Sequence, residues 1–189
     1  MNTSTQLRTF TELPWLKIFS QTIDQPQSLP AALAEHGLTL DQLFLFSKKS
    51  EDASEPYGRK LLFNNDEIEV MLACWSEKAA ASPHNHGHSQ GLIWFARGYF
   101  SEQHFRFQDR ELKKTELRQY PEGHVVRVDG NDIHSCSPNE TGLSLHIYSP
   151  PIHQMKVWDA KHRKTLIVAD HCGAWVPKNK ELILSETAW

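Results

Sequence analysis

Short apolar segments separated by turn residues run through the chain from Tyr57 onward, and they constrain the fold more than any other feature. They recur about every ten residues and include EIEVMLACW (67–75), GLIWFARGYF, HFRFQ, HVVRVDGNDIH, GLSLHIYSPP and TLIVAD. One face of the first of these is expected to carry Ile68, Val70, Leu72 and Cys74. No amphipathic segment of helix length separates them, so a parallel βαβ sheet is not expected. The pattern predicts an all-β sandwich, barrel or jelly roll.

The first fifty-odd residues show helical spacing instead. Apolar residues recur at every third position through residues 6–22: Leu7, Phe10, Leu13, Leu16 and Phe19. Pro14 predicts a break or the start of a second helix within that stretch. A further helix is predicted in SLPAALAEHG, with Ser28 as its N-cap and Gly37 as its C-cap. The TLDQ that follows has the form of a capping box.

The chain of 189 residues is long enough for one domain with a sizeable core. We therefore expect a single domain over residues 1–189, with a mainly helical part at 1–56 and a β-barrel at 57–189. The segment KKSEDASEP (48–56), at the end of the helical part, is typical of a polar surface linker.

The composition argues against several kinds of partner and location. The formal net charge is -3, and no basic run suggests binding to nucleic acid or to an anionic membrane. The longest apolar runs, such as LIWFA at 92–96, are too short to cross a bilayer, and the N-terminus lacks the pattern of a signal peptide. The three cysteines, Cys74, Cys136 and Cys172, form no CxxC pair, so we expect reduced thiols in a cytoplasmic protein.

Residues 83–91 read PHNHGHSQG and carry a histidine at every second position: His84, His86 and His88. On a strand, residues i and i+2 point to the same side, so the first two rings can aim at one point. The Cα of the third would lie about 13 Å from that of the first in an extended strand. We therefore expect two metal ligands from this motif and a third ligand from elsewhere in the chain, although such pairs also occur by chance and in structural zinc sites.

His134, in DGNDIHSCSPN, is the best candidate for the third ligand because it follows a turn and ends a short apolar stretch. An HxH motif and a separate histidine would hold three facial positions and leave the others open to ligands. The residues alone leave this choice open, since the chain has eleven histidines. A neutral set of three imidazoles suits Fe, Zn, Cu or Ni, so the metal is also left open.

A second constellation is SLHIYSPP at 144–151, where polar and apolar residues alternate. The polar set is Ser144, His146 and Tyr148, and the apolar set is Leu143, Leu145 and Ile147. Either the polar face is solvated, as in a half-exposed antiparallel strand, or it forms a buried row whose members bond one another or a ligand. In the second case the imidazole would fix the hydroxyl proton of Tyr148, which could then be donated to a group at the metal.

Arg59, in EPYGRKLL, lies at the start of the first predicted strand. A solvated surface charge is the commonest state of an arginine. Alternatively, its guanidinium would bind a substrate carboxylate through two parallel hydrogen bonds.

Together these stretches resemble cysteine dioxygenase type I, a thiol dioxygenase family of the cupin superfamily, in its bacterial form. The matching residues are YGR at 57–59, CW at 74–75, PHNH at 83–86, Gly98, IH at 133–134 and SLHIYSPP at 144–151. The resemblance covers roughly residues 57–160, with order and spacing kept. It implies an all-β fold, the cupin double-stranded β-helix or jelly roll, with helices packed at the N-terminal side.

The resemblance also implies a set of site residues and an activity. The metal ligands would be His84, His86 and His134, the substrate-binding residues Arg59 and Tyr57, and the catalytic residues Tyr148, His146 and Ser144. The cofactor would be Fe(II), and the reaction would oxidise L-cysteine with O2 to cysteine sulfinic acid. The partners would be this small thiol and O2, with no nucleic acid and no membrane, and we expect a monomer.

The chain departs from the family pattern at Gly91, where animal members carry a cysteine cross-linked to the tyrosine. Tyr148 should therefore be unmodified, and Cys136 does not match the cross-linking position. Thiol dioxygenases that prefer 3-mercaptopropionate carry a glutamine where this chain has Arg59, which favours cysteine, but a dioxygenase for another small thiol stays open. A third reading is a non-catalytic metal-binding cupin whose site is closed by His88 or Cys136.

Overall fold

The computed structural model describes residues 10–189, so Leu7 of the predicted apolar stripe lies outside the described residues. The helices are α2 (Trp15–Thr22), α3 (Leu29–Glu35) and α4 (Leu40–Phe46), with short 3-10 turns η1 (Pro26–Ser28) and η2 (Lys180–Leu182). None of the helices in the described part is long and apolar enough to cross a membrane.

The strands follow in a continuous series after the helices. They are β1 (Tyr57–Asn64), β2 (Glu69–Trp75), β3 (Gln90–Arg97), β4 (Phe100–Gln108), β5 (Glu111–Tyr120), β6 (Val125–Val128), β7 (Ile133–Pro138), β8 (Gly142–Ser149), β9 (Lys156–Asp159), β10 (Lys164–Val168) and β11 (Ile183–Ala188). They form a five-stranded sheet, β1-β2-β8-β3-β6, and two three-stranded sheets, β5-β4-β7 and β11-β10-β9. All named pairs are antiparallel.

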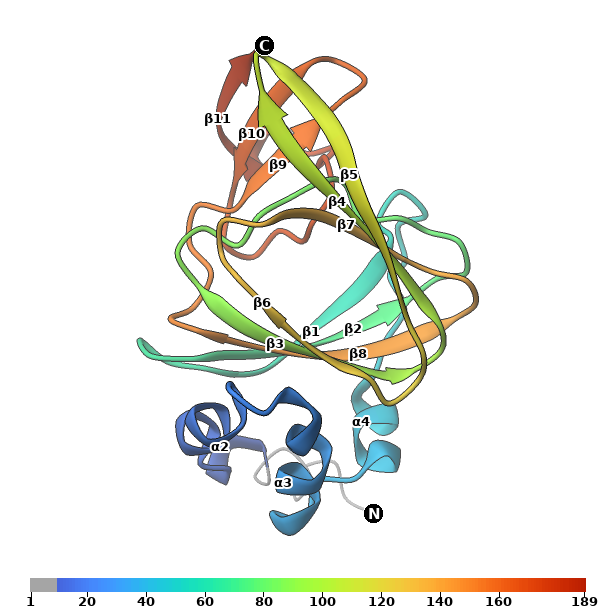
Figure 1. The fold of residues 1–189 in the computed structure, drawn as a ribbon, viewed down its shortest axis with the longest axis vertical. Coiled ribbons are helices and arrows are strands. Elements are labelled where there is room, and N and C mark those ends of the chain that lie inside the picture. The colour runs from blue at the N-terminus through green and yellow to red at the C-terminus, as the bar shows by residue number, and fades with distance from the viewer. Residues whose placement is uncertain (1–9) are drawn as a thin grey trace.

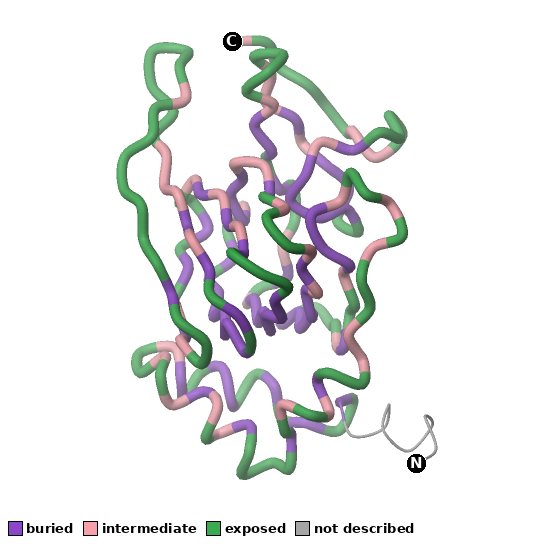
Figure 2. Tube along the Cα trace, turned by 90° about the vertical axis from the view of Figure 1, so that its right-hand side faces the viewer, coloured by how far each residue is buried: buried purple, intermediate pink, exposed green. Residues whose placement is uncertain are grey.

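The three helices lie against the outer side of the five-stranded sheet, and the two smaller sheets lie on its other side (Figure 1). This arrangement confirms the predicted all-β class with N-terminal helices. Buried residues are concentrated through the middle of the molecule, between the helical layer and the ends of the long strands (Figure 2). The five-stranded sheet is therefore covered on both faces.

Alternation along the strands sorts the side chains of this sheet into two separate cores. Leu72 and Leu145, which face each other across β2 and β8, pack in the cluster that contains the helix residues. Met71 and Ala73, one position away, belong to the other cluster, inside the barrel. Because the pleat sends neighbouring residues to opposite faces, each strand serves both cores.

The predicted apolar stripe of the first helix is wrong at Leu16, which is 39% exposed. The break expected at Pro14 is confirmed, since α2 starts directly after it. A new helix sets a new phase, so the buried face of α2 is formed by Trp15, Ile18, Phe19 and Thr22. The spacing of three that runs across Pro14 therefore does not mark one continuous helix face.

The helix ends match the predicted signals only in part. The capping box at the start of α4 is confirmed, because Gln42 donates its backbone N–H to the Thr39 side chain and accepts from the Thr39 backbone. Ser28 does stand at the N-cap of α3, but its hydroxyl donates to the Gln25 carbonyl instead of capping the helix. The predicted C-cap residue Gly37 has a positive φ of 77°, a conformation that glycine adopts without strain.

Gln27 fastens the helical layer to the open edge of the five-stranded sheet. Its Nε2 donates to the Val125 carbonyl over 2.6 Å, and the Val125 N–H donates to its Oε1 over 3.2 Å. Val125 begins the edge strand β6 and is 2% exposed. The side-chain amide thus satisfies backbone groups that a further strand would otherwise pair.

Replacing this amide should therefore weaken the fold. Gln27→Ala leaves the N–H and C=O of Val125 without partners, and we expect the free energy of unfolding to fall by about 1–3 kcal/mol. Chemical denaturation would measure the change. Gln21→Ala, at an exposed position of α2, is the matched control and should change stability by less than about 0.5 kcal/mol. Equal effects of the two substitutions would contradict the assignment.

Candidate metal centre

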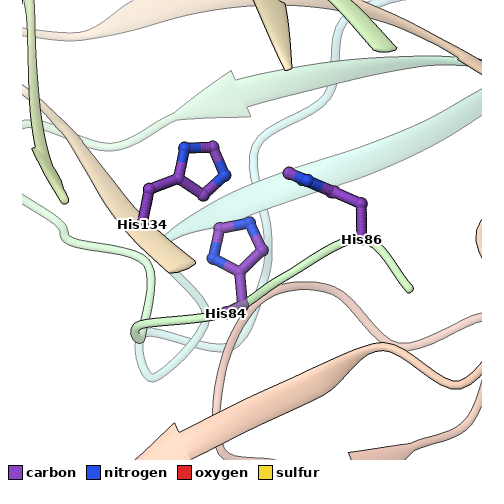
Figure 3. Close-up of side chains that lie close together, drawn as sticks. All are labelled: His84, His86 and His134. Atoms are coloured by element: carbon purple, nitrogen blue, oxygen red, sulfur yellow. The ribbon is translucent and has the colours of Figure 1, made fainter. Parts of the chain in front are cut away.

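Three histidine rings from two separate segments meet inside the barrel. His84 and His86 lie in the connection between β2 and β3, and His134 lies on β7. One ring nitrogen of each can be chosen so that all three atoms lie within 4.8 Å of one another. Figure 3 shows the three rings converging on a common point. The site therefore brings together the two motif histidines and the third histidine that the sequence favoured.

The backbone fixes this convergence through short pairings rather than through a regular strand. His84 and His134 exchange both backbone hydrogen bonds, at 2.9 and 3.0 Å, in an isolated antiparallel bridge. His86 donates its N–H to the Gly130 carbonyl over 2.9 Å. The prediction that the HxH pair lies on one extended strand is wrong, because both residues lie in the connection between β2 and β3 and His84 forms only isolated bridges. Gly87 turns the chain at a φ of +64° directly after the pair.

All three rings are buried, and burial keeps His84 and His86 in the neutral form that binds metals. His84, His86 and His134 are 6%, 2% and 2% exposed. Burial, followed by the neighbouring His134, lowers the pKa of His84 to about 3. The same causes lower the pKa of His86 well below its ordinary value. Both rings are neutral at pH 7 and have lone pairs available for a cation.

The unpaired ring nitrogens fit a bound metal ion. His86 Nδ1 and His134 Nε2 are buried and have no hydrogen-bond partner among the described residues. His84 Nδ1 lies 2.9 Å from the Ser82 carbonyl and donates to it, so the lone pair of its Nε2 is left for a ligand. Buried polar nitrogens without partners are costly unless a ligand uses them. The donor set therefore suits a divalent transition metal held by three imidazoles.

Glu102 on β4 orients the third ligand, a role that the sequence did not reveal. Its carboxylate accepts a hydrogen bond from His134 Nδ1, which leaves Nε2 of the same ring facing the other two histidines. This arrangement of carboxylate, histidine and metal site fixes the tautomer and makes the ring a stronger ligand. Glu102 is 3% exposed. In the sequence it is an ordinary acidic residue of the polar stretch SEQHF, so its role becomes visible only from the pairing of β4 with β7.

Two further residues hold Glu102 in place and keep it charged. His104 Nε2 lies 2.9 Å from Glu102 Oε2, and the Tyr120 hydroxyl donates to the same oxygen over 2.8 Å. Burial alone would raise the pKa of Glu102, but the hydrogen bonds from His104, His134 and Tyr120 lower it below its ordinary value. The carboxylate therefore stays ionised as the acceptor for the metal-ligand ring.

The polar row of β8 faces the barrel interior, so the solvated reading of SLHIYSPP is wrong. Ser144, His146 and Tyr148 are 0%, 7% and 2% exposed, while the alternate residues pack under the helices. Ser144 Oγ lies 2.7 Å from His146 Nε2, and His146 Nδ1 lies 2.9 Å from the Tyr148 hydroxyl. The Tyr148 hydroxyl in turn lies 3.3 Å from His86 Nε2.

The direction of this relay follows from Trp75, whose indole N–H donates to Ser144 Oγ over 2.8 Å. The Ser144 proton then has only His146 Nε2 as an acceptor among the described residues. Burial, with smaller effects of His134 and Arg59, lowers the pKa of His146 to about 3, so its neutral ring has one N–H. That proton must sit on Nδ1 and point at Tyr148. The Tyr148 proton is thereby left free for donation toward the metal centre.

Gly91 on β3 explains how the Tyr148 ring fits beside the centre. It is the direct cross-strand partner of Tyr148, and a Cβ added to it would lie only 2.6 Å from the ring carbon Cδ1. Position 91 therefore faces the tyrosine ring, and the absence of a side chain there leaves room for the ring.

Arg59 and Tyr57 on β1 both line the pocket that contains the histidines. The Arg59 guanidinium is already engaged: its Nη2 donates to Glu69 over 2.5 Å and its Nε to Met71 Sδ over 3.2 Å. The Tyr57 hydroxyl accepts the Ala174 N–H over 2.9 Å, and burial raises its pKa to about 12. The sequence placed both residues in the pocket but missed the partner Glu69.

The groups suggested as a fourth protein ligand do not join the cluster. His88 is exposed. Cys136 lines the pocket, and burial raises its thiol pKa well above the ordinary value. The ligand group found among the described residues contains the three histidines alone. The closed metal site therefore has no support from the geometry.

A model of the cysteine dioxygenase type I family matches residues 46–161, more than half of the chain. The chain belongs to this family. Cysteine dioxygenase type 1 of Bos taurus is 28% identical over 125 residues, which cover 61% of this chain and 62% of that protein. The Danio rerio protein of the same name is 28% identical over 124 residues, which cover 58% of this chain and 60% of that protein. The matched part of the chain thus spans less than two thirds of these relatives.

A solved structure extends the comparison to the fold. It is that of an uncharacterized conserved protein with a double-stranded β-helix domain from Klebsiella pneumoniae, with a TM-score of 0.51 and 11% identity. The match covers 64% of this chain and 88% of that one. At this identity the likeness concerns the fold alone. The predicted cupin double-stranded β-helix is confirmed.

The role given to Glu102 can be tested through metal affinity. Glu102→Gln replaces the anionic acceptor of His134 by a neutral amide, and we expect the affinity for Fe(II) or Zn(II) to fall about 10- to 100-fold. Competition with a chelator, under anaerobic conditions for iron, would measure it. Glu116→Gln, on the exposed side of the neighbouring strand β5, should leave the affinity unchanged. A parental affinity in Glu102→Gln would contradict the role.

Proposed function

We propose that this protein is a non-heme Fe(II) thiol dioxygenase that oxidises L-cysteine with O2 to cysteine sulfinic acid. The observation that carries the proposal is one pocket that contains three buried imidazoles, the Tyr148 hydroxyl and the Arg59 guanidinium. Membership of the cysteine dioxygenase type I family supports the same reaction. The thiol supplies all four electrons and both oxygen atoms end on sulfur, so no other reductant is needed.

His84, His86 and His134 would hold the iron, and the positions that they leave open would be available to the thiol and to O2. A bound Fe(II) ion would supply the redox chemistry and would lower the pKa of the substrate thiol to favour the thiolate. Glu102 would keep the His134 ring in the binding orientation. The ligand types alone do not choose iron, so this part of the proposal depends on the family.

Arg59 would bind the substrate carboxylate. Its Nε and one N–H of Nη2 are used by Met71 and Glu69, which leaves the outer edge of the guanidinium for a second carboxylate. A bidentate contact there would fix the orientation of the thiol, a contribution of proximity rather than of chemistry.

Tyr148 would donate a hydrogen bond from its hydroxyl to the reacting oxygen. Its hydroxyl lies 3.3 Å from His86 Nε2, and the relay from Trp75 through Ser144 and His146 leaves its proton pointing into the pocket. Burial raises the pKa of Tyr148 well above its ordinary value, so the phenol stays protonated at pH 7. A positioned donor in a buried site stabilises charge that develops on oxygen.

The rest of the pocket wall is largely apolar, with Met71, Trp75, Ile93, Phe95, Ile152 and Met155 among its residues. Such a wall excludes water and strengthens the few polar contacts inside. Cys74, Cys136 and Cys172 are free thiols, which supports a cytoplasmic location for the enzyme.

Oxygen uptake tests the proposal directly. The Fe(II)-loaded protein is given L-cysteine or 3-mercaptopropionate at equal concentration, and O2 consumption and sulfinate are measured. We expect uptake with cysteine at one O2 per cysteine sulfinate formed. Uptake with 3-mercaptopropionate alone would support the dioxygenase activity and contradict L-cysteine as its substrate. No uptake with either thiol, by protein with one iron per chain, would overturn the proposal.

Tyr148→Phe should separate proton donation from metal binding. Loss of one donor to the reacting oxygen is expected to lower kcat on the order of 10²-fold, while iron content and the melting temperature stay near the parental values. Steady-state O2 uptake and metal analysis provide the two readouts. Tyr99→Phe, which removes a hydroxyl on the exposed surface, is the control. Parental kcat in Tyr148→Phe would show that the hydroxyl has no part in the reaction.

A further inference from the structure

Strand β5 is a long, open sheet edge. It is the outer strand of the sheet β5-β4-β7 (Figure 1), and of its ten residues only Tyr120 is buried. Among the described residues, a single side chain bonds to its backbone, namely Gln103, whose Nε2 donates to the Glu116 carbonyl over 2.8 Å. The other backbone groups that point away from β4 are therefore left to water or to a further strand.

The remaining edges of the three sheets are either paired or carry charges of one sign. Gln27 bonds to the edge strand β6, and His84 forms bridges to both β7 and β9. The charged residues of β1 are the bases Arg59 and Lys60, and β11 has only the acid Glu186. Among the described edges that stay open, β5 alone carries acids and bases together.

A bulge decides which side chains of β5 share a face. The pairing of β4 with β5 shifts between Gln103 and Phe105, where β5 holds one extra residue. Side chains alternate along a strand, and the extra residue reverses the alternation beyond the bulge. One face of β5 therefore carries Glu111, Lys113, Glu116 and Arg118, and the other carries Leu112, Lys114 and Leu117.

Ion pairs within the strand agree with this assignment. Lys113 Nζ lies 3.4 Å from Glu111 Oε2 on one side of the bulge. Arg118 Nη2 lies 2.7 Å from Glu116 Oε2 on the other side. Each half of the strand thus has one acid and one base next to each other on the same face.

A second copy of β5 in antiparallel orientation complements both faces. With a two-fold axis between Lys114 and Thr115, each pair joins residues of the same face: Lys113 with Glu116, Glu111 with Arg118, and Leu112 with Leu117. Such an interface is self-complementary, so every pair occurs twice. Together with the pairs inside each strand, each of the four charges gains two neighbours of opposite sign, which is a network rather than a set of isolated surface pairs.

The apolar face gains from the same register. Leu117 is 60% exposed in the single chain, and an exposed leucine on an open edge favours association. In the paired arrangement it packs against Leu112 of the second copy. Lys114, on the same face beside the axis, keeps its ammonium group in water at the end of a flexible stem.

We propose that β5 is an interface between two copies of this chain, which join their β5 strands antiparallel into one continuous sheet. Charge complementarity with the strand itself points to a second copy as the partner. Two strands of ten residues make a small interface, so we expect a dissociation constant on the order of micromolar. The inference does not depend on the proposed activity.

Sedimentation of the full-length protein tests whether the association exists. Between about 1 and 100 μM we expect the mass to rise from that of one chain towards that of two. Added salt should shift the transition to higher concentration, because it screens the charge network. The mass of one chain at every concentration would keep the monomer expected from the sequence and overturn the inference.

Charge variants test the register. Lys113→Glu places like charges opposite each other twice, and we expect the dissociation constant to rise about 10-fold or more. Adding Glu116→Lys to this variant restores opposite charges across the axis and should restore association. Lys60→Glu, which makes the same charge change at an exposed position of β1, is the control. A double variant no tighter than Lys113→Glu alone would overturn the register.

Leucine variants test the apolar face. Leu117→Ser should weaken association, whereas Leu184→Ser on β11 should not, although both leucines are 60% exposed. Equal effects of the two substitutions would contradict an interface at β5.

Hydrogen exchange in the parent protein needs no substitution. Amides of β5 that face away from β4 should exchange more slowly as the protein concentration rises through the transition seen in sedimentation. Amides of β11 should show no such change. A protein that dimerises without added protection of β5 uses another surface, and that result would overturn the inference.

Discussion

The hydrogen bond between Glu102 and His134 is the interaction on which the candidate centre depends. Burial keeps His84 and His86 neutral, and a neutral imidazole can place its proton on either nitrogen. At His134 the ionised Glu102 carboxylate accepts a hydrogen bond from Nδ1 and so fixes the proton on that nitrogen. At His84 the Ser82 carbonyl fixes the proton on Nδ1 in the same way. The lone pairs then face one another across the site. An arrangement of buried lone pairs without donors is unfavourable in itself, so it indicates a cation.

Strand β8 joins this centre to the rest of the fold. Leu145 and Ile147 belong to the core beneath the helices, whereas His146 and Tyr148 face the histidines. The same alternation therefore fixes which residues hold the helical layer and which carry protons. A shift of one residue in the register would exchange the two sets. The apolar contacts with α2 and α3 thus help to keep the relay pointed at the metal centre.

The sequence revealed the parts of the site that local patterns encode. The PHNH motif, the alternating SLHIYSPP and the TLDQ capping box each carry their signal within a few residues. Glu102 and Glu69 carry none, and the CW match at 74–75 did not reveal the hydrogen bond that Trp75 makes, because these roles come from strand pairings between segments distant in the chain. Strand β5 was missed because ELKKTELRQY is nearly all exposed and polar, and Leu16 was misplaced because Pro14 restarts the helix. Local order was predictable, while cross-strand register was not.

The pairing of Arg59 with Glu69 is difficult to explain by stability. Taking two charges out of water costs more than their attraction usually returns, and apolar residues of similar volume often do as well in such places. Most of the neighbouring wall is apolar, so an apolar pair would fit it. A charged pair at the end of a pocket that opens to ligands is more readily explained by recognition, since each charge can be shared with a substrate group of opposite sign. On that argument the pair belongs to the wall that meets a ligand rather than to the core that stabilises the fold.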